Sequence, residues 1–127
     1  ANTAWAFAKV LSSRRHGNTE TVERLFKGVA VVAARRIPES FNALAIASTA
    51  WAFATLRLAP AFLFDVIART AALTIADFDA QHMSNVVWAF AKAGIAAPAL
   101  FDAVADEARG RMSDFKPQGL ANTAWAF

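Results

Sequence analysis

One short motif recurs along this 127-residue chain, and its spacing constrains the fold more than any other feature. The four tryptophans, at positions 5, 51, 88 and 125, are separated by 46, 37 and 37 residues, and each is followed by Ala-Phe. Self-similarity at a period of about 20–50 residues is typical of solenoids, in which stacked copies of one unit share a core. The chain is therefore predicted to be a repeat protein with a unit of about 37 residues.

The residues between the tryptophans favour helices. Apolar residues make up 57% of the chain, alanine dominates among them, and alanine is the best helix former. Glycine and proline are few and stand at the edges of the apolar stretches. The predicted fold class is all-α, an α-solenoid of stacked helix-turn-helix repeats. It forms one domain over 1–127, with units of about 1–40, 41–77, 78–114 and a partial 115–127.

Helix signals recur at matching places in successive units. An Asn or Asp precedes the first helix of a unit, and a Pro or Gly separates it from the second helix. The first unit is nine residues longer, mostly through a polar stretch at 12–18, which is predicted to be a loop. The predicted elements are helices over about 19–36, 43–57, 61–72 and 98–109, N-caps at Asn42 and Asp79, stops at Gly94 and Gly110, and first-turn prolines at Pro98 and Pro117.

A helical wheel divides the first helix of each unit into three surfaces. One stripe is predicted to pack on the second helices: Ile46, Thr49, Phe53 and Leu56 in one unit, and Met83, Val87, Phe90 and Ala93 in the next. Alanines on the flanks suit close packing of neighbouring first helices. The remaining surface, which we call the tryptophan face, carries Asn2, Trp5 and Lys9; Ser48, Trp51 and Thr55; Asn85, Trp88 and Lys92; and Asn122 and Trp125.

The chemistry of the tryptophan face suits single-stranded RNA. An indole can stack on any base, an amide side chain offers a donor and an acceptor to a base edge, and lysine can meet a phosphate. Arg14 and Arg15, in the inserted stretch, could also grip phosphates. Each residue type has a plainer alternative: tryptophans that pack between helices, asparagines that bond local backbone, and cations that are only solvated.

Composition narrows the other classes of function. A formal charge of +3 permits nucleic-acid binding without requiring it. There is no cysteine, and His16 and His82 lack the spacing of metal ligands, so no metal site is predicted. No phosphate-binding loop, catalytic triad or membrane-spanning run is present in the sequence. We expect no catalytic residue, cofactor, small-molecule substrate or membrane association, and hence no enzyme.

The amino-acid sequence of the motif resembles that of known protein families. Leu-Ala-Asn-Thr-Ala-Trp-Ala-Phe at 120–127 and Trp-Ala-Phe-Ala-Lys-Ala-Gly at 88–94 resemble the repeats of organellar RNA-binding α-solenoids. These include the octotricopeptide-repeat proteins of algae, the heptatricopeptide repeats of RAP-domain proteins and the FAST-kinase-like proteins, and the wording is most similar to proteins of algae or other protists. The resemblance implies a factor for RNA processing, stability or translation in a mitochondrion or chloroplast. It carries over no catalytic residue, since no RAP domain is found within the chain.

Three hypotheses follow. The first is an RNA-binding helical-repeat segment of an organellar RNA factor, with single-stranded RNA as its partner. The second is a protein–protein scaffold that uses the same surface, as a subunit of a larger ribonucleoprotein such as an organellar ribosome. The third is the non-catalytic part of an RNA-processing enzyme.

Overall fold

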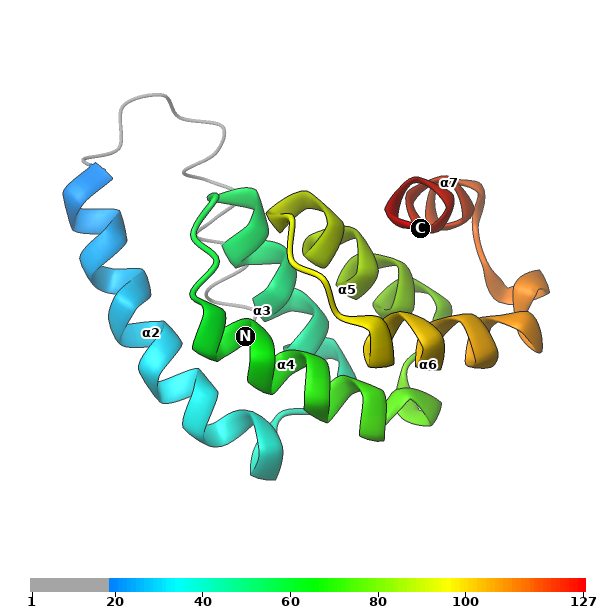
Figure 1. Cartoon of the computed structure of the whole chain (residues 1–127), viewed down its shortest axis with the longest axis horizontal. Coiled ribbons are helices and arrows are strands. Elements are labelled where there is room, and N and C mark those ends of the chain that lie inside the picture. The colour runs from blue at the N-terminus through cyan, green and yellow to red at the C-terminus, as the bar shows by residue number, and fades with distance from the viewer. Residues whose placement is uncertain (1–18) are drawn as a thin grey trace.

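A computed structural model describes residues 19–127, and this part of the chain is helical throughout (Figure 1). The all-α helical-repeat prediction is confirmed, because the described residues form six α-helices, two short 3-10 helices and no strand. The helices are α2 (Thr19–Ser40), α3 (Ala43–Thr55), α4 (Ala61–Leu73), α5 (Ala80–Ala93), α6 (Pro98–Arg109) and α7 (Pro117–Ala126), with 3-10 turns at Ile75–Asp77 and Met112–Asp114.

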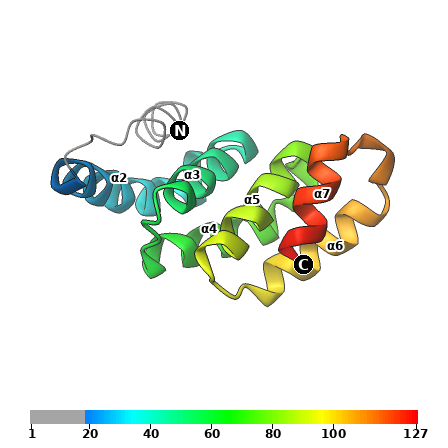
Figure 2. The same ribbon diagram turned by 90° about the horizontal axis from the view of Figure 1, so that it is seen from above.

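The helices form two layers (Figures 1 and 2). Helices α3, α5 and α7 lie side by side in what we call the A layer. Helices α2, α4 and α6 form the B layer, which packs against it. Helices α3 and α5 are each followed by the B helix of their own unit, and neighbouring units stack through both layers. Helices stacked in this way bury the apolar face that a single helical hairpin would leave in water.

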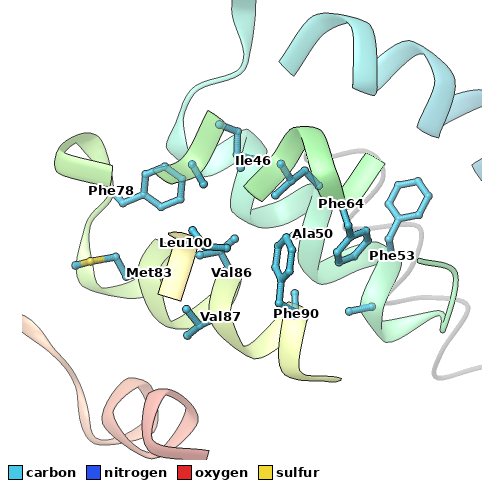
Figure 3. Close-up of a cluster of buried hydrophobic side chains, with 14 of the residues drawn as sticks. Ile46, Ala50, Phe53, Phe64, Phe78, Met83, Val86, Val87, Phe90 and Leu100 are labelled. Carbon is cyan, nitrogen blue, oxygen red and sulfur yellow. The ribbon is translucent and has the colours of Figure 1, made fainter. Parts of the chain in front are cut away.

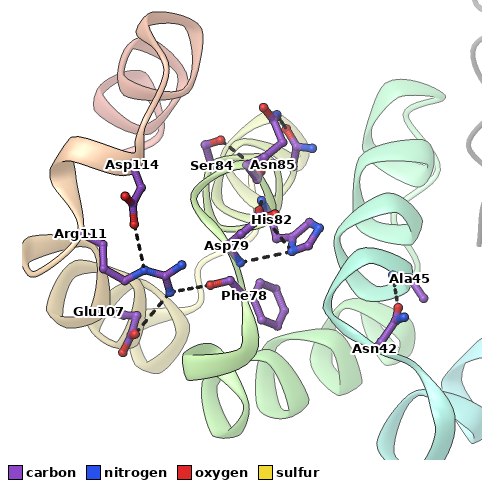
Figure 4. Close-up of polar contacts among 11 residues, drawn as sticks. Asn42, Ala45, Phe78, Asp79, His82, Ser84, Asn85, Glu107, Arg111 and Asp114 are labelled. Carbon is purple, nitrogen blue, oxygen red and sulfur yellow. Dashed lines mark hydrogen bonds and ion pairs between the residues drawn. The ribbon is translucent and has the colours of Figure 1, made fainter.

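The predicted helix boundaries rest on the expected capping residues (Figure 4). The side chain of Asn42 accepts a hydrogen bond of 2.9 Å from the Ala45 N–H at the start of α3. Asp79 caps α5 in the same way, accepting at 2.8 Å from the His82 N–H, while the His82 ring accepts from the Asp79 N–H. Gly94 ends α5 in the left-handed conformation, with φ of 71°. These bonds satisfy backbone groups that a helix end leaves without partners.

Helix α2 is longer than the sequence indicated. It continues four residues past the predicted end at Arg36 and contains Pro38 in its last turn. The side chain of Ile37 is buried, so the extra turn places an apolar residue in the core. Pro38 has no N–H to donate within the helix, and the Ser40 hydroxyl donates to the Arg36 carbonyl oxygen at 3.1 Å.

Pairs of phenylalanines join the B helix of one unit to the A helix of the next (Figure 3). The ring centroids lie 5.1 Å apart for Phe26–Phe53, 5.0 Å for Phe64–Phe90 and 4.9 Å for Phe101–Phe127. These distances are in the range in which aromatic rings attract each other. The first two pairs are buried, whereas Phe127 at the open end of the stack is 59% exposed.

The predicted core stripe faces inward. Ile46, Thr49, Phe53, Met83, Val87 and Phe90 are buried, and Leu56 and Ala93 are half-buried at the edge of the core. The flanking alanines of α3 are buried as well: Ala47, Ala50, Ala52 and Ala54. Small side chains there let α3 and α5 approach closely, as the wheel predicted.

A polar cluster around Arg111 joins the end of the third unit to its beginning (Figure 4). Its guanidinium donates to the Phe78 carbonyl oxygen at 2.7 Å and to the Glu107 carboxylate at 3.4 Å. Its Nε lies 3.7 Å from the Asp114 carboxylate. One half-buried side chain therefore ties α6 and the following turn to the start of α5.

Candidate nucleic-acid interface

The tryptophan face is continuous over the three A helices that the structure describes. In each helix the structure adds one residue to the predicted face, one turn before the first residue that the sequence predicted. It consists of Leu44, Ser48, Trp51 and Thr55 on α3; Gln81, Asn85, Trp88 and Lys92 on α5; and Gln118, Asn122 and Trp125 on α7. The predicted contacts Asn2, Trp5, Lys9, Arg14 and Arg15 lie outside the described residues.

The tryptophans contact one another. The Trp51 and Trp88 rings are stacked with centroids 6.2 Å apart, and those of Trp88 and Trp125 are tilted at 6.5 Å. Trp51 and Trp88 are half-buried, and Trp125 is 60% exposed. The indoles therefore form a column across three units, so they pack between helices and also contribute to the surface.

Amide pairs stand next to this column on α5 and α7. The Gln81 amide donates to the Asn85 side-chain oxygen at 2.9 Å, and the Gln118 amide donates to the Asn122 oxygen at 3.0 Å. Both glutamines are exposed and both asparagines are half-buried. The two glutamines lie one turn before the tryptophan motif and outside the residues predicted from it, although their 37-residue spacing is visible in the sequence.

Helix α3 presents little polar surface at the matching positions. Ser48 is only 9% exposed, and Leu44 replaces the glutamine. The Thr55 hydroxyl oxygen is buried and has no hydrogen-bond partner within the part of the chain that the structure describes. Of the α3 residues on this face, Leu44 is exposed, and Trp51 and Thr55 are half-buried.

The two layers differ in charge. Helices α3, α5 and α7 contain no Asp or Glu, and α5 carries the exposed Lys92 in its last turn. The B helices carry both signs, partly as exposed pairs such as Arg69–Asp65 at 3.2 Å and Arg109–Asp106 at 3.0 Å. A polyanion therefore meets no carboxylate on the A helices themselves.

Other kinds of site find little support in residues 19–127. This region holds no group of three or more side chains arranged to bind a metal ion. None of its helices combines the length and the apolar character needed to cross a lipid bilayer.

The fold and this face define an all-α helical-repeat protein with an aromatic and amide surface along one layer. Over residues 18–127 the sequence matches the family model described as RNA-editing substrate-binding complex 6 protein, and the chain belongs to that family. A search of curated proteins found no match. The chain is thus an RNA-related helical protein. The match names neither the octotricopeptide-repeat nor the RAP-domain proteins that the motif resembles.

Proposed function

We propose that the tryptophan face binds single-stranded RNA within an RNA-processing complex. The observation that carries the proposal is the alignment of amides, indoles and Lys92 on neighbouring A helices. The family description, which names an RNA-editing substrate-binding complex, supports the same reading. The A layer would bind the RNA, and the B layer would hold the A helices in register.

Each component of the face has a matching RNA group. Exposed amides can hydrogen-bond base edges, which single-stranded RNA leaves accessible. Lys92 offers a cation to a phosphate, and the absence of carboxylates from the A helices avoids repulsion. The half-buried indoles of Trp51 and Trp88 and the 60% exposed indole of Trp125 are available for contact with bases.

The narrower parts of the proposal rest on the motif resemblance. We propose that the chain is a segment of an organellar factor for RNA processing, stability or translation, acting in a mitochondrion or chloroplast. Its role is to bind rather than to catalyse, and the chemistry would belong to other components of the complex.

Salt dependence of binding to single-stranded RNA tests the proposal. For each tenfold rise in salt concentration, the affinity for a single strand falls by about 0.7 logarithmic units per phosphate contact. Lys92→Ala is expected to weaken binding and to lower this slope by about one contact. Arg109→Ala, which removes the same charge from the B layer, is the matched control and should change neither. Absence of RNA binding by the parent chain, or equal effects of the two substitutions, would count against the tryptophan face.

A second candidate is a protein contact on the B layer, and one observation favours it. An apolar groove of about 710 Å³ runs between α4 and the loop before α6, with Phe62 50% exposed beside it. This differs from the scaffold hypothesis drawn from the sequence, because the protein contact would lie on the B layer and not on the tryptophan face. A protein could then bind the B layer while RNA binds the A layer. Phe62→Ser should then weaken assembly with other subunits of the complex while leaving RNA affinity unchanged.

A further inference from the structure

The two amide pairs on the tryptophan face have the same residue types and the same geometry. Gln81–Asn85 and Gln118–Asn122 stand 37 residues apart, at the same height on neighbouring A helices. In both, the glutamine donates to the asparagine oxygen, at 2.9 and 3.0 Å. This bond uses one lone pair of the asparagine oxygen and one N–H of the glutamine, so in each pair the asparagine NH₂ and the glutamine oxygen are the groups that it leaves unused.

We infer that these pairs are two equivalent base-reading positions, and that the RNA this chain prefers carries the same base at two neighbouring positions. The inference rests on the proposed RNA-binding function. A base edge in single-stranded RNA offers a donor next to an acceptor, and the order of the two differs between bases. Because the internal hydrogen bond orients both pairs alike, both select the same order.

The spacing of the units suits one nucleotide per unit. Trp88 and Trp125, which lie one turn beyond the two asparagines, have ring centroids 6.5 Å apart. This is nearly twice the rise of about 3.4 Å per base in a stacked strand. Bases that contact neighbouring units are therefore unstacked from each other, and unstacked bases are the ones whose edges proteins read.

A cavity between the two units gives a base room beside the first pair. It has a volume of about 340 Å³ and lies between the N-terminal turns of α5 and α7. Its polar lining comes from both units and from the turn before α7: Asp79, Gln81, Ser84, Arg111, Asp114 and Lys116. The size is at the lower end of small-molecule sites, and the two carboxylates in the lining are matched by two cations, of which the lysine can meet a phosphate.

The unit before these two lacks the pair. Its matching residues are Leu44 and Ser48, so it offers no amide. The chain thus supplies its own replacement residues for an experiment, since the same fold already accommodates Leu and Ser at this height. Gln81→Leu with Asn85→Ser removes the reader on α5, and Gln118→Leu with Asn122→Ser removes the one on α7.

The experiment measures the affinity of the parent chain and the two double variants for short RNAs. The RNAs are homopolymers of each base, and then the preferred RNA with a substituted base at either of two neighbouring positions. The parent chain should prefer one base by about fivefold to a hundredfold, with equal penalties at the two positions. Each double variant should lose the penalty at one position only. Thermal unfolding checks that both variants are folded.

The outcomes separate this inference from the proposal beneath it. Salt-dependent RNA binding without base preference, or a preference that survives both double variants, overturns the inference and leaves RNA binding in place. Unequal penalties that reside in a single unit also overturn it, because the two pairs would then not be equivalent. If the parent chain binds none of the RNAs, both the proposed function and the inference fail.

Discussion

Helices α3 and α5 occupy equivalent places in consecutive units. Their buried residues are alike, whereas their residues on the tryptophan face differ. Phe53 and Phe90 are both fully buried and each packs edge-on against a phenylalanine of the preceding B helix. On the tryptophan face, by contrast, α5 presents Gln81, Asn85 and Lys92 where α3 has Leu44, Ser48 and Thr55. The buried positions are held by packing, whereas the outer positions make no such demand on the side chain and can differ between units.

The largest effect expected from this comparison is at the buried phenylalanines. Phe90→Ala should lower the free energy of unfolding by about 3–5 kcal/mol, because it removes a fully buried ring and leaves a cavity. Phe53→Ala should cost a similar amount. Asn85→Ser, on the outer face of the same helix, should cost less than about 0.5 kcal/mol. Urea unfolding measures all three, and comparable losses at Phe90 and Asn85 would contradict the division between inside and outside.

A second difference lies in the turns that lead into α5 and α7. The turn before α5 has Thr74, whose hydroxyl donates to the Thr70 carbonyl oxygen, within its own unit. The matching position before α7 is Arg111, which reaches back to the Phe78 carbonyl oxygen at 2.7 Å. Arg111→Met keeps the aliphatic part of the side chain and removes the hydrogen-bond donors. It should lower the free energy of unfolding by about 1–3 kcal/mol.

The control for Arg111 is a neighbouring arginine with a solvent-exposed partner. Arg109 pairs with Asp106 at the surface, where such pairs contribute about 0–1 kcal/mol. Arg109→Ala should therefore leave the unfolding midpoint almost unchanged. A loss at Arg109 as large as that at Arg111 would show that the hydrogen bond from Arg111 to the Phe78 carbonyl oxygen is not the source of the effect.

The same comparison explains which features the sequence could predict. The layers, the caps at Asn42 and Asp79 and the outward place of Trp88 follow from periodicity and local capping chemistry, which need only nearby residues. The bond from Arg111 to Phe78 joins residues 33 positions apart, so it depends on how the turn is placed in space. The extension of α2 through Pro38 depends on Ile37 finding a buried place, which only the packed units supply.

The candidate site divides in a similar way. Periodicity alone places the indoles on one face, but their mutual contact depends on the distance between units, which sequence spacing does not contain. The buried hydroxyl of Thr55 is likewise a consequence of packing. The roles of the amides and of Lys92 toward RNA remain predictions, and the binding experiments above address them.

The smallest expected effect concerns the ends of α3 and α5. Arg57 and Gly94 hold the same place in their units, and both have positive φ, of 59° and 71°. A side chain in this left-handed region costs roughly 1 kcal/mol, which glycine avoids. Gly94→Ala should therefore destabilise by about 1 kcal/mol. Arg57→Gly should stabilise by less than that, because glycine also loses more chain entropy on folding.

Thermal and urea unfolding of the two variants check this last pair. The informative result is the sign, since most substitutions destabilise and a gain at Arg57 requires relief of strain. Arg57→Ala serves as the control, because it removes the same charge while keeping a Cβ in the left-handed region, and it should give no gain. If Arg57→Gly destabilises as Gly94→Ala does, the helix ends of the two units are not equivalent, and the agreement between α3 and α5 stops before their last turns.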